Sequence, residues 1–263
     1  MTLALSRRAV LVAALLVPGA GRLTAQAAAP RTGADVLEAM RSAYAGKWYH
    51  TLTFKQTTTL RAPDGTERKE TWYETLSHTA AGTKLRIDRG DLSAGNGMIY
   101  TPDSLFMVRG GQPQPPRGKG NEFLPLIEGV YVQPVAKTVK ELSQMNVDMN
   151  RVRTATWEGT PVWVVGASSA ADTTSPQFWV STDRKLLVRM MLATGDGPPY
   201  DVRLGKYVKA GGGWLATKIE MFQGGTLRQA EEYSDWKVDV PVDPAMFDVS
   251  KWTTAPHWAK SAK

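Results

Sequence analysis

His50 and His78 are the two side chains of this sequence best placed to share a metal ion. They lie in two segments of strand periodicity joined by a turn. Pairing whose residue numbers sum to 128 sets them opposite each other on the apolar face, with Cβ atoms about 5 Å apart. Glu74 shares that face as a possible third ligand, and catalytic zinc takes three protein ligands. We favour the alternative that both histidines lie at the open end of the hairpin, hydrogen-bonded to water or main chain, and expect no metal.

Other patterns that carry catalysis are weak or absent. The sequence has no Gly-x-Ser-x-Gly elbow, no phosphate-binding glycine loop and no His-Glu-x-x-His helix. Ser234 and Lys237 match a Ser-x-x-Lys pattern, but in a strand they point to opposite faces. The chain contains no cysteine, which excludes thiol catalysis and thiolate metal sites. We therefore expect neither an enzyme nor a cofactor.

Residues 1–27 have the layout of a secretory signal peptide. Arg7 and Arg8 precede an apolar run over residues 9–17, and Ala25-Gln26-Ala27 is a small-residue cleavage site. The run is shorter than the roughly 20 residues that cross a bilayer. The arginine pair also fits a twin-arginine signal, so both export routes stay open. We expect a soluble exported protein, with residues 28–263 forming one domain.

The charge balance gives little sign of a nucleic-acid partner. The chain has 32 Lys and Arg against 25 Asp and Glu, and three of the basic residues belong to the signal. The remaining excess is mild and spread along the chain, whereas nucleic-acid surfaces cluster Lys and Arg with aromatic residues. We expect no nucleic acid, although weak attraction to anionic membrane surfaces is compatible with this charge.

Periodicity predicts one helix followed by mostly strands. Residues 32–45 have a capping box at Thr32 and an apolar stripe, which indicates a helix. Residues 48–60 and 67–78 place apolar side chains at even positions around an Ala-Pro-Asp-Gly turn, which indicates a long hairpin. The sum of 128 aligns the apolar faces of both strands, and a slip by one residue would separate them.

Ten further strands are expected, with turn signals between them, and this spacing is typical of a sandwich or barrel. They cover residues 84–89, 97–100, 104–109, 152–157, 161–166, 177–181, 186–193, 200–209, 214–222 and 227–238. Between the third and fourth of them, residues 112–121 are rich in Pro, Gly and basic residues. An apolar stretch and an amphipathic helix starting near Pro134 follow.

This order of elements resembles the LolA-like periplasmic lipoprotein-carrier superfamily. The resemblance rests on the Phe54-Lys55-Gln56 strand, the segments at 84–88 and 98–108, the hairpin at 178–189 and the ending at 240–247. It extends over about residues 32–249. The chain differs from lipoprotein carriers of the family at residues 112–120 and near 194–200, so the resemblance does not fix the substrate.

The resemblance implies a mainly β (α+β) fold: an unclosed, strongly curved antiparallel β-barrel, with an N-terminal helix and lid helices over an apolar concave face. It also implies a soluble periplasmic carrier or sensor that binds a lipid or the acyl chains of a lipoprotein without catalysis. Arg86 is the nearest candidate for the arginine that locks the lid in family carriers. We expect the cavity wall to contain Leu52, Phe54, Trp72, Leu76, Leu85 and Ile87, and the lid to contain Phe123, Leu124, Leu126 and Ile127.

Two other functions remain open at this point. In the first, the protein's own helices fill the concave face and the outer surface binds envelope proteins. In the second, the His50 and His78 pair holds a metal for hydrolysis. An open apolar void under movable helices favours a carrier, whereas native-density packing favours the interaction module. If the protein is a carrier, we expect a monomer that can also bind membrane proteins of the envelope.

Overall fold

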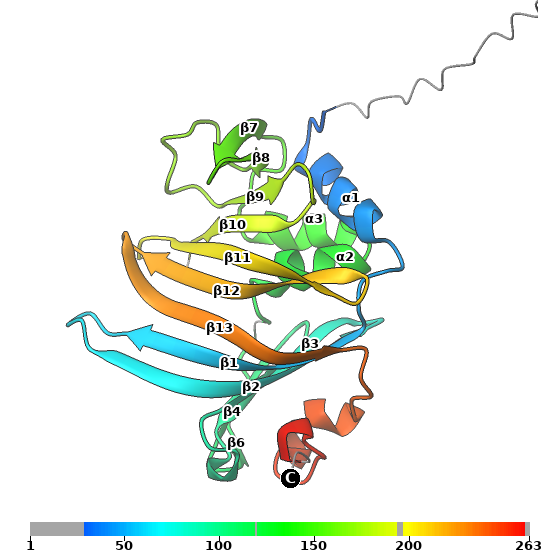
Figure 1. The fold of residues 1–263 in the computed structure, drawn as a ribbon, viewed down its shortest axis with the longest axis vertical. Helices are drawn as coiled ribbons and strands as arrows, with labels where there is room; N and C mark the ends of the chain where they lie inside the picture. Colours follow the sequence, from blue (N-terminus) through cyan, green and yellow to red (C-terminus); the bar gives the residue numbers. More distant parts are fainter. Residues whose placement is uncertain (1–28, 119, 194–196, 261–263) are drawn as a thin grey trace, which may run out of the picture.

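The computed structural model describes residues 29–118, 120–193 and 197–260, and the expected signal peptide lies outside these ranges. The strands of the described chain form one antiparallel sheet of 13 strands (Figure 1). The sheet curves strongly and does not close, because β6 and β7 are its two edges. This confirms the expected mainly β, unclosed barrel. Within the described residues, no helix is long and apolar enough to cross a membrane.

The strands are consecutive neighbours throughout, with one exception. Their order is β6-β5-β4-β3-β2-β1-β13-β12-β11-β10-β9-β8-β7. The strand bounds are β1 Thr51–Arg61, β2 Glu67–Thr79, β3 Gly82–Arg89, β4 Gly97–Tyr100, β5 Leu105–Arg109, β6 Gln112–Pro113, β7 Val152–Trp157, β8 Thr160–Val165, β9 Gln177–Ser181, β10 Leu187–Leu192, β11 Tyr200–Ala210, β12 Gly213–Gln223 and β13 Thr226–Val238. The exception is the β1–β13 pairing, which joins the two halves of the chain with Leu52 opposite Val238.

The first hairpin has the predicted register. Leu52 pairs with Leu76 and Gln56 with Trp72, as a sum of 128 requires. Its turn contains Gly65, whose positive φ of 87° suits glycine. Because alternate residues of a strand point to opposite faces, this register sends the even-numbered residues of β1 and β2 to the concave side.

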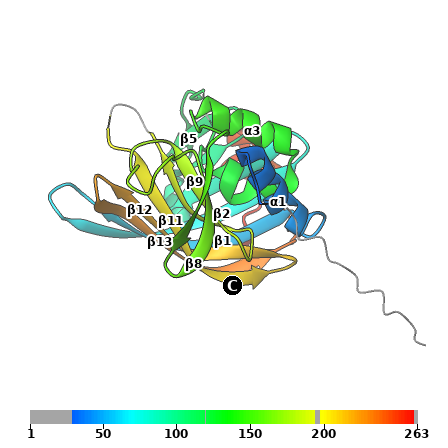
Figure 2. The same cartoon turned by 90° about the horizontal axis from the view of Figure 1, so that it is seen from above.

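Helices cover one end of the concave face (Figure 2). Helix α1 (Gly33–Tyr44) begins at Thr32, whose side chain accepts a hydrogen bond from the Asp35 amide in the predicted capping box. The π-helical turn η2 (Pro125–Gly129), α2 (Val130–Val132) and α3 (Val135–Gln144) follow β6 in sequence. Both α2 and α3 pack against α1. We use the term lid for residues 123–132.

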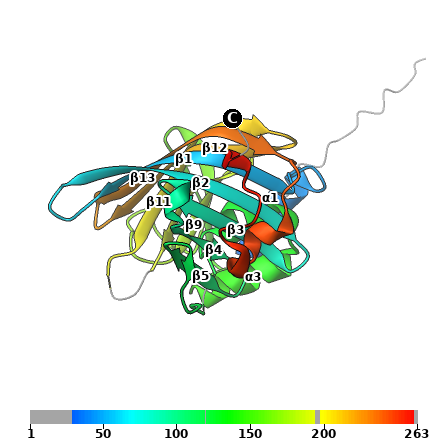
Figure 3. The same cartoon turned by 90° about the horizontal axis from the view of Figure 1, so that it is seen from below.

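The C-terminal segment packs on the convex face of the sheet. It forms three short 3₁₀ turns, η3 (Pro244–Phe247), η4 (Val249–Lys251) and η5 (Trp258–Lys260). Figure 3 shows this red segment beside β3, and η3 contacts that strand. Trp252 and Phe247 pack with Ile99 and Val108 in an apolar cluster separate from the main core. Both faces of β3 are therefore covered.

Candidate functional site

A cavity of about 1260 Å³ lies between the concave face of the sheet and the lid. Its walls come from β1 to β5 on one side and from β11 to β13 on the other. One end is lined by buried residues such as Trp48 and Tyr131, and the other by exposed residues of the β1–β2 turn, including Pro63. The volume is large enough for a ligand of drug or lipid size, since ordinary ligand sites measure about 300–1,000 Å³.

Every side chain that we expected in the cavity wall lies on its surface. These residues are Leu52, Phe54, Trp72, Leu76, Leu85 and Ile87. All six are buried, and they are contributed by alternate positions of β1, β2 and β3. The period-2 pattern and the hairpin register place them there together. Their contact with a ligand stays a prediction.

The lid contributes three of its four expected residues to the cavity. Phe123, Leu124 and Ile127 line it and are only partly buried. Leu126 is not part of the lining, because it is fully buried in the main core. It therefore anchors the lid, while its neighbours face the open volume.

The lid is held to the sheet by a buried carboxylate, that of Glu128. Its Oε1 accepts a hydrogen bond from the Tyr49 hydroxyl at 2.7 Å, and its Oε2 accepts one from Nε1 of Trp48 at 3.0 Å. His78 Nε2 lies 3.5 Å from the same Oε2. Trp48 also stacks on Tyr131 of the lid, with ring centroids 3.8 Å apart. Glu128 thus joins the lid to the segment before β1 and to the end of β2.

Glu128 was not among the site residues predicted from the sequence. The available signal was an acidic residue inside the apolar stretch of residues 123–132. Such a residue usually marks the solvent face of a helix. Its partners Trp48 and Tyr49 are about 80 positions away in sequence, so no local pattern connects them.

Two carboxyl groups also face the cavity. Glu74 of β2 and Glu231 of β13 line it, and each is 5% exposed. Glu231 accepts hydrogen bonds from the Tyr233 hydroxyl (2.8 Å) and from Nε2 of Gln229 (2.5 Å). Burial raises the pKa of Glu74 well above its usual value, and the charge of Glu231 raises it further. Burial also raises the pKa of Glu231.

Solved structures share this architecture. A putative outer membrane lipoprotein-sorting protein domain from Vibrio parahaemolyticus matches with a TM-score of 0.56 at 10% identity, covering 84% of this chain and 98% of that one. A LolA superfamily protein from Nitrosomonas europaea matches with a TM-score of 0.51 at 13% identity, covering 82% and 97%. The fold is LolA-like. A DUF1329 family protein from Desulfovibrio piger gives 0.55 at 13% identity, covering 82% and 95%.

Comparison by sequence gives no further assignment. No family model matches the chain. No curated protein matches it either. At identities of 10–13%, the structural matches establish the LolA-like fold alone.

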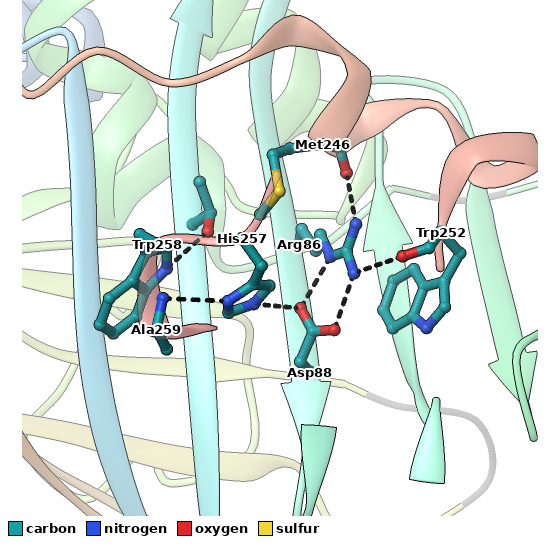
Figure 4. Close-up of polar contacts among 8 residues, drawn as sticks. Arg86, Asp88, Met246, Trp252, His257, Trp258 and Ala259 are labelled. Carbon is teal, nitrogen blue, oxygen red and sulfur yellow. Dashed lines mark hydrogen bonds and ion pairs between the residues drawn. The ribbon is translucent and has the colours of Figure 1, made fainter. Parts of the chain in front are cut away.

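In this LolA-like sheet, Arg86 lies on the face opposite the lid, so the nearest candidate for a lid-locking arginine does not contact the lid. Leu85 and Ile87 point into the cavity, so Arg86 and Asp88 between and beside them point to the convex side. The Arg86 side chain forms two hydrogen bonds with Asp88, at 2.7 and 2.8 Å. It also donates to the carbonyl oxygens of Met246 and Trp252 (Figure 4). Arg86 therefore holds the C-terminal segment.

Asp88 completes this convex-face cluster. His257 Nε2 lies 3.1 Å from Asp88 Oδ2, and the Arg86 guanidinium stacks 3.8 Å from the centre of the Trp252 ring. Burial alone would raise the pKa of Asp88, but its hydrogen bonds with Arg86 and His257 outweigh that effect and lower it. The cluster has the character of a structural anchor, because its hydrogen bonds join β3 to the C-terminal segment.

The two predicted histidines lie opposite each other, but their side chains do not form a metal site. The His78 amide donates to the His50 carbonyl oxygen at 2.9 Å, as the register requires. His50 is exposed, whereas His78 contacts Glu128 and has its Nδ1 2.9 Å from the Thr83 hydroxyl. Glu74 lies four positions from His78 along β2. In the described ranges, no group of three or more His, Cys, Asp or Glu side chains is arranged to hold a metal ion.

Proposed function

We propose that this protein is an exported, noncatalytic carrier or sensor that binds a lipid or the acyl chains of a lipoprotein in its cavity. The observation that carries the proposal is the cavity of about 1260 Å³, walled by apolar side chains and covered by a lid. Burying an acyl chain there contributes about 0.8 kcal/mol per methylene group. Residues 28–263 would act as one periplasmic domain, exported by the Sec or twin-arginine route.

The size of the cavity favours a carrier over a module whose own helices fill the sheet. A self-filled concave face would be packed at the density of a protein interior, with few voids larger than a water molecule. Here Phe123 and Ile127 of the lid are only partly buried against the open volume. A cover that lies over an apolar surface without filling the space beneath it suits a ligand that enters by displacing it.

The partners follow from the same chemistry. An acyl chain is insoluble in water, so a soluble carrier must receive it from a membrane or a membrane protein and deliver it to another. We propose a lipid or acylated lipoprotein as cargo, envelope membrane proteins as donor or acceptor, and a monomer as the working form. The LolA-like fold supports this choice of cargo.

Native mass spectrometry tests the proposal. The purified protein is measured directly, then extracted with organic solvent for lipid analysis, and the stripped protein is incubated with phospholipids and with acylated peptides. We expect a bound acyl species and an affinity that rises about fourfold for each added methylene group. A protein that stays free of ligand under both conditions contradicts the carrier.

A matched pair of variants locates the binding. Phe54→Glu places a charge on the cavity wall, and we expect it to abolish binding. Thr59→Glu places the same charge on the other face of β1, opposite Lys69, and we expect normal binding. Circular dichroism checks that both variants fold. Equal binding by the two variants would mean that the ligand lies outside the cavity.

A further inference from the structure

The cavity differs from a purely apolar acyl site because two carboxyl groups face its interior. Glu74 lies between Phe54 and Ile87, its pairing partners on β1 and β3, and both of these are wall residues. Glu231 reaches the same cavity from β13, on the other side of β1. Burying carboxyl groups in apolar surroundings is costly. A bound acyl chain has no polar group that would offset that cost.

Glu74 is the more unusual of the two. In the part of the chain that the structure describes, no side chain or amide forms a hydrogen bond or ion pair with its carboxyl group, although the residue is 95% buried. Buried polar groups in proteins have a partner in the great majority of cases, whereas the oxygens of Glu74 face the accessible volume of the cavity. A bound ligand can therefore supply the partner.

The positive charges of the described chain do not supply that partner. Arg68, Arg117 and Arg228 line the cavity as well, but Arg68 pairs with Glu70 and neither of the other two forms an ion pair with Glu74 or Glu231. Arg89, on the neighbouring strand β3, bonds to Glu70 at 2.9 Å and stacks over Trp72. Arg61, near the β1–β2 turn, is paired with Glu67. Arg86 points to the convex face. The carboxyl groups are thus left for a positive charge that arrives with the cargo.

The position of Glu74 indicates how such a cargo would lie. Leu76 follows two residues later on the same face, and Leu52 and Leu85 flank Leu76 on the neighbouring strands. This apolar part of the wall lies between Glu74 and the end covered by the lid. A ligand would place its hydrocarbon part there and its polar group next to Glu74 and Glu231.

We propose that Glu74, supported by Glu231, forms a subsite for the primary amino group of a cationic amphiphile, such as a long-chain amine or an amino lipid. An ammonium group supplies three donors and a full charge, and charge-assisted hydrogen bonds are about twice as strong as neutral ones. Its attraction to a carboxylate grows where apolar walls lower the local dielectric, as around the buried Glu74. This inference rests on the proposed acyl-binding function and names its ligand class.

The raised pKa of Glu74 is consistent with this subsite. In the empty cavity, burial and the charge of Glu231 favour the protonated carboxyl group. An incoming ammonium group stabilises the carboxylate instead, so binding should release a proton. Such a release would not accompany a merely structural role of Glu74.

Calorimetry with three ligands of equal chain length tests the subsite: dodecylamine, dodecanol and dodecanoic acid, each below its micelle concentration. We expect the wild-type protein to bind the amine at least tenfold more tightly than the alcohol and to release protons, which are measured from the buffer dependence of the enthalpy. Glu74→Gln should lose this preference and the proton release while still binding the alcohol.

Glu232→Gln is the matched control. Glu232 neighbours Glu231 on β13, but it is exposed on the other face and should leave all three affinities unchanged. Equal binding of the three ligands, tighter binding of the acid, or a preference that survives Glu74→Gln would overturn the amine subsite while leaving the acyl carrier intact. Failure of all three ligands to bind would reject both proposals.

Discussion

Glu74 illustrates how a side chain that is suited to binding a ligand can destabilise the ligand-free protein. Because its folded-state pKa is raised, the folded protein holds a proton that the unfolded chain releases above about 4.5. The stabilising effect of that proton is complete below the unfolded pKa and is lost as the pH rises toward the folded pKa. At neutral pH the buried carboxyl group of Glu74 therefore lowers the free energy of unfolding of the ligand-free protein.

We predict that Glu74→Gln stabilises the ligand-free protein at neutral pH. The neutral amide removes the cost of ionising a buried group, so the free energy of unfolding should increase by about 1–3 kcal/mol at pH 7 and hardly change at pH 4. Urea unfolding at both pH values measures the difference, with Glu232→Gln as reference. A variant that is less stable than wild type at pH 7 would show that Glu74 has an internal partner.

The pKa of Asp88 is shifted in the opposite direction to that of Glu74, because its hydrogen bonds with Arg86 and His257 lower it. The contribution of Asp88 to the free energy of unfolding is present above the unfolded pKa and is lost as the pH falls through the folded pKa. We predict that Asp88→Asn costs about 3 kcal/mol at pH 7 and less near pH 3, since it leaves the buried Arg86 uncompensated. Chemical unfolding across this range measures the effect, and the exposed Asp103→Asn should show none.

The lid is the element whose motion the proposed function requires. It is tied down through Glu128, whose carboxylate accepts hydrogen bonds from Trp48 and Tyr49, whereas Leu126 anchors it in the core. One tether is polar and the other apolar. Breaking the polar tether should loosen the lid without unfolding the sheet.

We predict that Glu128→Gln speeds hydrogen exchange at the amides of residues 125–132 and lowers the free energy of unfolding by about 1–3 kcal/mol. The amide cannot accept two strong hydrogen bonds as a carboxylate does. Amides of β1 and β2 should keep their protection. Mass spectrometry of exchanged peptides gives both values, with the exposed Glu38→Gln of α1 as control. Unchanged exchange in the lid would mean that its apolar contacts, through Leu126, Val130 and Tyr131, are sufficient to hold it.

The elements that could be predicted from the sequence are those determined by residues close to one another in the chain. The register of β1 and β2 followed from alternation around one turn, and α1 followed from Thr32 and Asp35 within one capping box. The wall residues came with that register. These features need only neighbours in sequence or across one hairpin.

Features that depend on distant segments were missed or misassigned. Arg86 and Asp88 alternate with apolar residues in β3 and therefore suggest a polar face, but the C-terminal segment, some 160 positions later, covers them. Glu128 presents the same difficulty, because a polar residue in an amphipathic pattern is normally solvated. Glu74 does not, since the hairpin register already placed it on the apolar face. Long-range packing overrode the local pattern at Arg86, Asp88 and Glu128.

At the scale of the whole molecule, the open sheet leaves two edges that must not aggregate. The edge strand β6 has only two residues and includes Pro113, which cannot donate to another strand. The other edge, β7, has six residues and contains Arg153, a charged residue of the kind that discourages pairing. We predict a monomer by analytical ultracentrifugation at micromolar concentrations, and a concentration-dependent dimer would point to pairing through β7.

The central pairing of the first strand with the last also governs how the chain folds. Strand β1 has β2 on one side, but its other neighbour, β13, ends near residue 238. The sheet therefore cannot be completed until almost the entire chain has become available. Proteins dominated by such distant contacts fold slowly, on the scale of milliseconds to seconds. A chain synthesised from its N-terminus would meanwhile carry an unfinished sheet with exposed apolar side chains, and such a species is prone to aggregate until β13 has been made.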